Sequence, residues 1–310
     1  MKILVTTPVK HLPGVEELLE SKGEVFYLEN GTKEEVRTKL ISENIDTIVC
    51  NPNKQGYKID EELLKGTNVT LINTCSTGLN HIDAEYCIKK LILVQSLTKD
   101  TSLIKQLPST AELAFGLLLD LLRNISKSNK EVKENLTWDY TPFVGHQLKG
   151  YKVGIVGYGR LGTMMHKYLK AFGADVLCYD PYYDPIYLPG KQVRSLEHLF
   201  DECDAISLHV HVTDETRGFI TEDLLSRRVK YLVNTSRGEI VDENAIVDSL
   251  REGKLKGYAT DVIADEFGDI QNSPLLKLQN QDLNIIFTSH IGGMTIEGQT
   301  LAFTHSINKL

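Results

Sequence analysis

The stretch KVGIVGYGRLGTMMHKYLKAFGADVLCYD, residues 152–180, decides the fold predicted for this chain. It begins with an apolar strand, turns through a glycine-rich segment, continues as an amphipathic helix that ends at Gly173, and finishes as a second apolar strand. A strand, a helix and a strand in this order form a unit with parallel strands. The stretch therefore predicts a parallel sheet that is covered by helices.

The glycine-rich turn has the spacing G-x-G-x-x-G at Gly157, Gly159 and Gly162. The first glycine permits the tight turn, the second lets a pyrophosphate approach the backbone, and the third lets the helix pack closely on the strand. The N-terminus of the helix offers N–H groups and a positive dipole to the phosphates. Asp180 ends the next strand, where an acid can bind both ribose hydroxyls and repel a 2′-phosphate. We therefore predict a dinucleotide site for NAD rather than NADP, with a purely structural glycine turn as the alternative.

The same alternation of strands and helices continues on both sides of this stretch. Further strands are predicted at residues 205–210, 230–236, 258–262 and 284–290, with helical patterns between several of them. An earlier series has strands at residues 2–8, 25–29, 47–50 and 69–75. The two series predict an α/β protein with two sheets.

Two helical segments suggest how the domains are connected. Residues 108–124 are apolar on nearly every side, which predicts a buried helix, and Ser109 with Glu112 matches a capping box at its start. The segment after Gly292 is helical without a strand of its own, so we expect it to pack on the first domain. We therefore predict a Rossmann-type, doubly wound nucleotide-binding domain, residues 102–285, inserted into a flavodoxin-like α/β domain, residues 1–101 plus 286–310.

Composition limits the possible partners and the compartment. The chain has 310 residues, enough for two domains, and a net charge of −8. This charge gives no support to a nucleic-acid partner or to an anionic membrane surface. The five cysteines form no CxxC pair and no cluster with metal-ligand spacing, so we expect reduced thiols and no metal. The first apolar run is too short for a signal peptide, and no segment has the length of a transmembrane helix, which predicts a cytoplasmic protein.

Four polar residues follow strands of the second series. Arg237, Asp261 and His290 come at strand ends, and Glu266 comes five residues after Asp261. Because ligands of a doubly wound sheet bind at the carboxyl ends of its strands, we expect these side chains at the nicotinamide. A buried cation such as Arg237 needs a partner, which is either a protein carboxylate or an anion that arrives from outside.

These residue types suit hydride transfer at the carbonyl of a 2-keto acid. The planar guanidinium of Arg237 can hold carboxylate and carbonyl oxygens. His290 can give and take a proton near neutral pH, and a nearby Glu266 orients the imidazole and favours its protonated form. Alone, His290 is more often a structural histidine and Glu266 a solvated loop charge, but their joint placement favours a catalytic site.

With these residues, the chain resembles the D-isomer-specific 2-hydroxyacid dehydrogenases. The resemblance covers nearly the whole chain and rests on GYGRLG with Asp180, SLHVHVTDETRGFI, LVNTSRGEIVDE, DVIADE and TSHIGG. It implies Arg237, Glu266 and His290 as the catalytic triad, and a homodimer formed through the nucleotide-binding domain. It implies a cofactor site made by Gly157, Gly159, Arg160, Leu161, Gly162, Asp180, His209, Thr235, Asp261, Gly292 and Gly293, in which Asp261 receives the nicotinamide carboxamide. It also implies that backbone N–H groups of Thr77 and Gly78, in STGLNHID, bind the substrate carboxylate.

Three residues depart from the family pattern, which commonly has proline at each place. They are His211, Phe267 and Ser289, and none removes a functional side chain. The side chain of the substrate stays open. Phosphoglycerate-type members carry basic residues in the first domain, and the comparable loop here offers Lys54 and Lys58 but no arginine.

Two other classes of function stay open at this stage. Some proteins of this fold act as NAD(H)-sensing corepressors and keep the catalytic residues, so sequence does not separate a sensor from an enzyme. Another Rossmann enzyme, such as a methyltransferase, would leave Arg237, Glu266 and His290 without roles. The leading hypothesis is an NAD-dependent dehydrogenase that interconverts a small D-2-hydroxy acid and its 2-keto acid.

Overall fold

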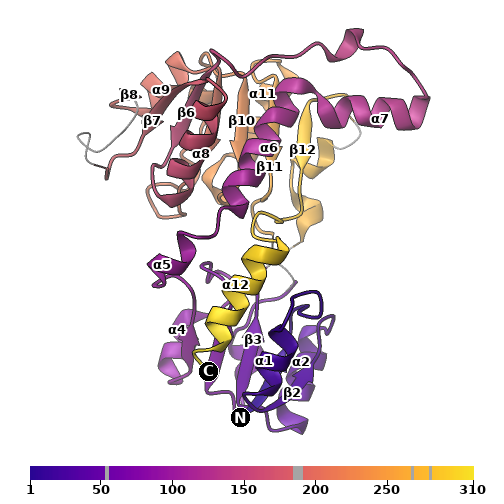
Figure 1. Cartoon of the computed structure of the whole chain (residues 1–310), viewed down its shortest axis with the longest axis vertical. Helices are drawn as coiled ribbons and strands as arrows, with labels where there is room; N and C mark the ends of the chain where they lie inside the picture. Colours follow the sequence, from indigo (N-terminus) through magenta and orange to yellow (C-terminus); the bar gives the residue numbers. More distant parts are fainter. Residues whose placement is uncertain (53–55, 184–190, 267–268, 279–280) are drawn as a thin grey trace. The chain divides into compact units, whose positions relative to one another are not determined.

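The computed structural model describes residues 1–52, 56–183, 191–266, 269–278 and 281–310. The chain divides into two units, each with its own parallel sheet and its own helices (Figure 1). Unit 1 comprises Met1–Leu107 and Gly293–Leu310, and unit 2 comprises Pro108–Gly292. The predicted two-domain α/β fold is confirmed in this respect.

Unit 1 is built on a five-stranded parallel sheet with the order β2-β1-β3-β4-β5. The strands are β1 (Lys2–Val5), β2 (Glu24–Tyr27), β3 (Thr47–Cys50), β4 (Leu71–Thr74) and β5 (Leu93–Gln95). This order is that of a flavodoxin-like sheet, as predicted. The sequence did not indicate β5, a three-residue strand at the edge of the sheet.

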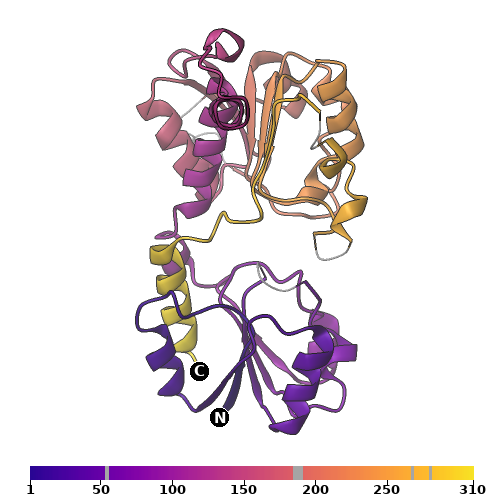
Figure 2. The ribbon, with the colours of Figure 1, turned by 90° about the vertical axis from the view of Figure 1, so that its right-hand side faces the viewer.

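The helices of unit 1 include the C-terminal one, which lies beside α1 (Figure 2). They are α1 (Val15–Glu20), α2 (Lys33–Ser42), α3 (Glu61–Leu64), α4 (Ala84–Lys89), α5 (Thr101–Ile104) and α12 (Ile296–Ile307). Phe303 and Ile307 of α12 are buried in one cluster with Val15 and Leu19 of α1. The chain therefore returns to unit 1 after unit 2.

Unit 2 contains a seven-stranded parallel sheet with the order β12-β11-β10-β9-β6-β7-β8. The strands are β6 (Lys152–Val156), β7 (Asp175–Tyr179), β8 (Lys191–Gln192), β9 (Ala205–Leu208), β10 (Tyr231–Asn234), β11 (Gly257–Thr260) and β12 (Ile285–Phe287). Numbered within the unit, this is the Rossmann order 3-2-1-4-5-6 with a further strand beside the sixth. The order reverses between β6 and β9, so ligands are expected at the carboxyl ends of these strands.

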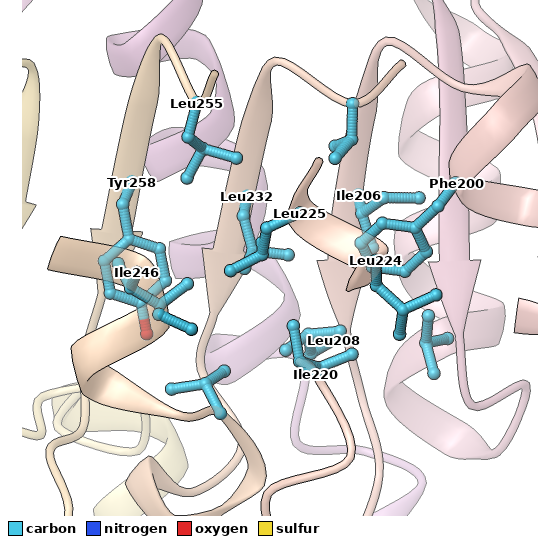
Figure 3. Close-up of a cluster of buried hydrophobic side chains, with 14 of the residues drawn as sticks. Phe200, Ile206, Leu208, Ile220, Leu224, Leu225, Leu232, Ile246, Leu255 and Tyr258 are labelled. Carbon is cyan, nitrogen blue, oxygen red and sulfur yellow. The ribbon is translucent and has the colours of Figure 1, made fainter. Parts of the chain in front are cut away.

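Unit 2 has six α-helices in the described part of the chain, and five of them, all except α7, pack on the faces of this sheet. The six are α6 (Ser109–Arg123), α7 (Ile125–Asn135), α8 (Arg160–Ala171), α9 (Leu196–Glu202), α10 (Glu222–Leu225) and α11 (Glu243–Arg251), with 3-10 turns at Thr141–Phe143, Gly238–Ile240, Ile270–Asn272 and Leu276–Leu278. One buried cluster joins the sheet to α6 and α8, and another joins it to α9, α10 and α11 (Figure 3). In the described part of the chain, no helix is both long enough and apolar enough to cross a membrane.

The connections between the units lie later in the chain than predicted. The predicted insertion, residues 102–285, would detach β12 from the sheet in which it pairs with β11. It would also take α5 away from unit 1, to which α5 belongs. The capping box predicted at Ser109 is wrong, because Pro108 is the N-cap of α6 and Ser109 is already helical.

Candidate active site

The glycine-rich turn connects β6 to α8, and Gly159 is the N-cap of this helix. Gly157 has φ 89°, and a Cβ there would lie 2.4 Å from the His209 carbonyl oxygen. A Cβ at Gly162 would lie only 2.0 Å from the Gly157 carbonyl oxygen, so helix and turn touch. A Cβ at Gly159, by contrast, would meet nothing within 4 Å. The turn thus borders open space at the glycine where we predict the pyrophosphate.

Asp180 lies directly beside this turn. One carboxylate oxygen accepts a hydrogen bond from the backbone N–H of Tyr158 (2.7 Å), and the other accepts one from Tyr182 (2.9 Å). Each oxygen has a second lone pair, so the half-buried carboxylate can still accept a ribose hydroxyl. Arg160 and Leu161 form the start of α8, where both are half-buried, and burial lowers the pKa of the Arg160 guanidinium.

Two polar atoms at the ends of β9 and β10 have no hydrogen-bond partner among the described residues. They are the buried Nδ1 of His209 and the buried Oγ1 of Thr235. The other ring nitrogen of His209 lies 2.9 Å from Ser207 Oγ, and burial lowers the pKa of His209 to about 4. The imidazole is therefore neutral at pH 7. Because buried polar atoms normally have partners, these two atoms fit a site for a polar ligand such as the predicted dinucleotide.

The Asp261 carboxylate, only 2% exposed, holds the loop that carries His290. Its Oδ1 accepts hydrogen bonds from the Thr288 hydroxyl (2.5 Å) and the Ile291 N–H (2.8 Å). Its Oδ2 accepts one from the Gly292 N–H (2.8 Å), and a Cβ at Gly292 would lie 3.0 Å from the same oxygen. The sequence assigned Asp261 to the cofactor alone, and the contacts show this additional role within the protein.

His290 and Glu266 form the pair that the sequence predicts. His290 Nδ1 lies 2.8 Å from Glu266 Oε2, and the two side chains are 22% and 16% exposed. His290 has φ 55°, a left-handed conformation that is costly for residues other than glycine. Its backbone N–H donates to the Asp261 carbonyl oxygen (2.9 Å), which helps to hold this conformation. The second oxygen of Glu266 is buried and has no partner among the described residues.

Arg237 follows β10 in a turn that polar side chains brace. The Asn234 amide donates to the Arg237 carbonyl oxygen (2.9 Å) and accepts from the Ser236 N–H (3.0 Å). The Ser236 hydroxyl donates to the Leu208 carbonyl oxygen (2.8 Å) on the neighbouring strand. The half-buried guanidinium donates from Nη1 to the Ser236 carbonyl oxygen (2.7 Å). In the described part of the chain, no ion pair includes Arg237.

The remaining predicted site residues belong to unit 1. Thr77 and Gly78 follow β4, with Thr77 exposed, and their carbonyl oxygens accept hydrogen bonds from Thr98 Oγ1 and Ser76 Oγ (both 3.0 Å). Gly293 is exposed at the start of the C-terminal segment. The roles assigned to these three residues stay predictions.

The three departures from the family pattern lie in exposed or undescribed segments. His211 is exposed, and its carbonyl oxygen accepts a hydrogen bond from Thr216 Oγ1 (2.6 Å). Ser289 is exposed beside His290. Phe267 and the basic residue Lys54 lie outside the described residues. Among the residues that are described, no group of three or more His, Cys, Asp or Glu side chains could hold a metal ion.

Sequence reasoning missed the residues that support the site. Asn234 is fully buried and braces the turn of Arg237, and Thr288 bonds to Asp261. Glu243 is 7% exposed and accepts hydrogen bonds from the segment before Glu266 and from beyond it. For Asn234 and Thr288 the only signal in the sequence was their place close to Arg237 and His290, and Glu243 had no such signal.

The sheet order, the glycine turn at the start of α8 and the acid after β7 define a Rossmann-type dinucleotide-binding protein. The chain belongs to the D-isomer specific 2-hydroxyacid dehydrogenase family, because residues 115–292 match the model of that family's NAD binding domain. The predicted family, fold and cofactor NAD are therefore confirmed.

Individual proteins agree with this assignment. The chain is 33% identical over 310 residues to a D-3-phosphoglycerate dehydrogenase of Methanocaldococcus jannaschii, covering 98% of this chain and 56% of that protein. It is 30% identical over 298 residues to a hydroxypyruvate reductase of Thermotoga maritima, covering 95% and 92%. A D-lactate dehydrogenase structure from Aquifex aeolicus, complexed with NAD and lactic acid, has a TM-score of 0.78 and 28% identity, covering 100% of this chain and 94% of that one. The chain spans about half the length of the first two curated relatives that it matches.

Proposed function

We propose that this protein is an NAD-dependent dehydrogenase that interconverts a small D-2-hydroxy acid and its 2-keto acid. The observation that carries this proposal is the His290–Glu266 pair, with 2.8 Å between Nδ1 and Oε2, on the sheet that also presents Arg237 and the glycine turn. Support comes from relatives that are named as dehydrogenases or reductases of such acids.

The residues divide the reaction between binding and proton transfer. Bound NAD supplies a hydride acceptor for oxidation, and NADH supplies a hydride donor for reduction. Arg237 holds the carboxylate and carbonyl oxygens of the acid. In reduction His290 donates a proton to the carbonyl oxygen, and in oxidation it removes the proton from the hydroxyl. Because Nδ1 is bonded to Glu266, Nε2 is the nitrogen that exchanges this proton.

The supporting contacts keep this chemistry in place. Glu266 fixes the orientation of the imidazole and stabilises its positive charge. Asp261 holds the backbone on the C-terminal side of His290 by accepting from Ile291 and Gly292 (both 2.8 Å). We keep the nicotinamide carboxamide as a further partner of Asp261. The remaining lone pair of its Oδ2 is available for that contact.

We propose a small 2-hydroxy acid whose carboxylate is bound at Thr77 and Gly78. The alternative substrate is a phosphorylated acid. The Methanocaldococcus jannaschii relative is named as a D-3-phosphoglycerate dehydrogenase, and the exposed Lys58 offers a positive charge for a phosphate. A panel should therefore contain both phosphorylated and unphosphorylated 2-keto acids.

The decisive experiment follows NADH oxidation with hydroxypyruvate, phosphohydroxypyruvate, glyoxylate and 2-ketoglutarate. We expect turnover of at least one acid, and a fall in kcat/KM of roughly 10²- to 10³-fold in Arg237→Ala, because a charged contact to the developing charge is lost. Arg251→Ala, which changes an exposed arginine of the same unit, is the matched control. Undiminished activity in Arg237→Ala would overturn the role of that residue.

The same panel separates the enzyme from a binding protein. If no acid is reduced but the protein binds NADH tightly, as measured by fluorescence, the result would instead favour an NAD(H)-sensing corepressor-like function. A protein that binds S-adenosylmethionine and does not bind NADH would overturn both the dehydrogenase hypothesis and the sensor hypothesis.

For the assembly, we propose a homodimer formed through unit 2. The helix α7 has no buried residue, and the segment that follows it exposes four large apolar side chains. They are Leu136 (88% exposed), Trp138 (91%), Tyr140 (83%) and Val144 (75%). An exposed apolar segment of this kind is typical of an interface. The cytoplasmic location stays a prediction.

A further inference from the structure

Glu243, the first residue of α11, is a buried carboxylate that the proposed reaction does not use. It is 7% exposed, and no cation pairs with it in the described part of the chain. Its Oε1 accepts a hydrogen bond from the Ala264 N–H (2.7 Å), and its Oε2 accepts one from the Ser273 hydroxyl (2.9 Å). Burying a carboxylate is costly, and these two bonds and the N-terminus of α11 offset that cost. A buried carboxylate whose partners are an N–H group and a hydroxyl therefore needs a structural or functional reason.

The two partners of Glu243 lie on either side of Glu266 in the chain. Ala264 comes two residues before Glu266, and the intervening Asp265 has φ 55°. A non-glycine residue keeps this left-handed conformation only where its surroundings hold it. The bond to Ala264 holds the backbone directly before that turn, and the bond to Ser273, itself buried, holds the chain beyond it.

The same backbone also lies against the turn that follows Arg237. A Cβ at Gly238 would lie 1.9 Å from the carbonyl carbon of Ile263 and 2.1 Å from the nitrogen of Ala264. No side chain fits there, so the Gly238 turn packs directly on the backbone that Glu243 holds. A shift at Ala264 would therefore disturb both the Arg237 side and the Glu266 side of the site.

We propose that Glu243 is a positioning residue that holds Glu266 where it can form its hydrogen bond with His290. It holds the Ala264 backbone, Asp265 turns the chain, and Glu266 then reaches His290 Nδ1 at 2.8 Å. This inference rests on the proposed function, because it assigns Glu243 a role in the proton transfer by His290. Glu243 itself touches neither substrate nor cofactor in this role.

The test compares Glu243→Ala, Glu243→Gln and Ser273→Ala with the wild type in reduction of the best 2-keto acid of the panel. Glutamine can accept from Ala264 and donate to the Ser273 hydroxyl, so it keeps both bonds, whereas alanine removes both. Ser273→Ala removes one bond and is the milder variant if Glu243→Ala does not fold. Asp248→Ala, which removes an exposed acid from the same helix, is the matched control.

We expect kcat to fall about 10- to 100-fold in Glu243→Ala and less in Ser273→Ala, while Glu243→Gln and Asp248→Ala stay near the wild type. The dissociation constant of NADH should stay within about twofold, because the dinucleotide turn is untouched.

The outcomes separate this proposal from the proposed function. An inactive wild type overturns the proposed function. An active wild type whose Glu243→Ala and Ser273→Ala variants keep its turnover overturns the positioning role. A loss of kcat that comes with weaker NADH binding also overturns it, because a general structural defect has that signature.

Discussion

The substitution Asp261→Asn tests whether a buried carboxylate holds the loop of His290. The wild-type group accepts from the Thr288 hydroxyl (2.5 Å) and from the backbone N–H groups of Ile291 and Gly292 (both 2.8 Å). An amide has nearly the same shape, but it presents one acceptor oxygen and one NH₂ donor. In either orientation, its NH₂ group faces a backbone N–H that pointed at a carboxylate oxygen before. One charge-assisted bond is therefore replaced by two opposed donors.

The expected loss follows from these contacts. A hydrogen bond to a charged group contributes about 1.5–3 kcal/mol, and a buried donor without a partner costs about 1–3 kcal/mol. The hydroxyl of Thr288 can turn to compensate only if it faces the new NH₂ group. We therefore expect a loss of about 2–4 kcal/mol in the free energy of unfolding. For a unit of this size, that loss lowers the Tm by roughly 5–15 °C.

The assay is urea unfolding of the protein without cofactor, with Asp282→Asn as the control. Asp282 is 88% exposed and, among the described residues, pairs only with Lys127 at the surface, so its substitution should change stability by about 0.5 kcal/mol at most. Without cofactor, a contact to the nicotinamide carboxamide cannot contribute, and only the loop contacts are measured. An Asp261→Asn protein as stable as the wild type would refute the loop-holding role.

Two other predictions address pH dependence and assembly. Burial lowers the pKa of His209 to about 4, below about 6.5 in the unfolded chain, so the unfolded state binds more protons between these values. Stability should therefore fall by roughly 1–3 kcal/mol as the pH drops from about 6.5 to 4, and His209→Asn should lack this component in urea midpoints measured across the range; identical profiles would contradict it. Trp138, the only tryptophan and 91% exposed, should become buried in a homodimer, so its emission should shift to the blue as the protein concentration rises. Leu136→Asp should prevent that shift, and a monomer by sedimentation at every concentration would contradict the dimer.

Most of the fold could be predicted because long apolar runs with the right spacing are local signals. The two missed strands, β5 and β8, have three and two residues and lie at sheet edges, so they carry almost no periodicity. The connection after unit 2 was placed too early because the pairing of β12 with β11 decides which sheet β12 joins. Pairing of that kind depends on residues that are distant in sequence, and no local pattern reports it.

The sequence indicates side chains that are candidates to act on a ligand, but it does not indicate contacts that side chains make with the backbone. Arg237, Glu266 and His290 stand out because charged groups follow apolar strands. Asp261 stands out in the same way, but its bonds to backbone N–H groups do not, and neither does Glu243, which also binds the backbone; the partner residues include alanine, isoleucine and glycine. Nothing in the identity of such partners marks them in a sequence, because every residue except proline offers the same N–H group.

These two carboxylates explain why the His290–Glu266 pair forms at all. Both members of the pair depend on left-handed backbone, at His290 itself and at Asp265 before Glu266 (φ 55° in each). Neither conformation is favoured locally, so tertiary contacts must hold both. Asp261 supplies those contacts for one loop from the position directly after strand β11, and Glu243 supplies them for the other from helix α11 of the same unit. Loss of either carboxylate should therefore weaken the same 2.8 Å bond, although neither one touches it.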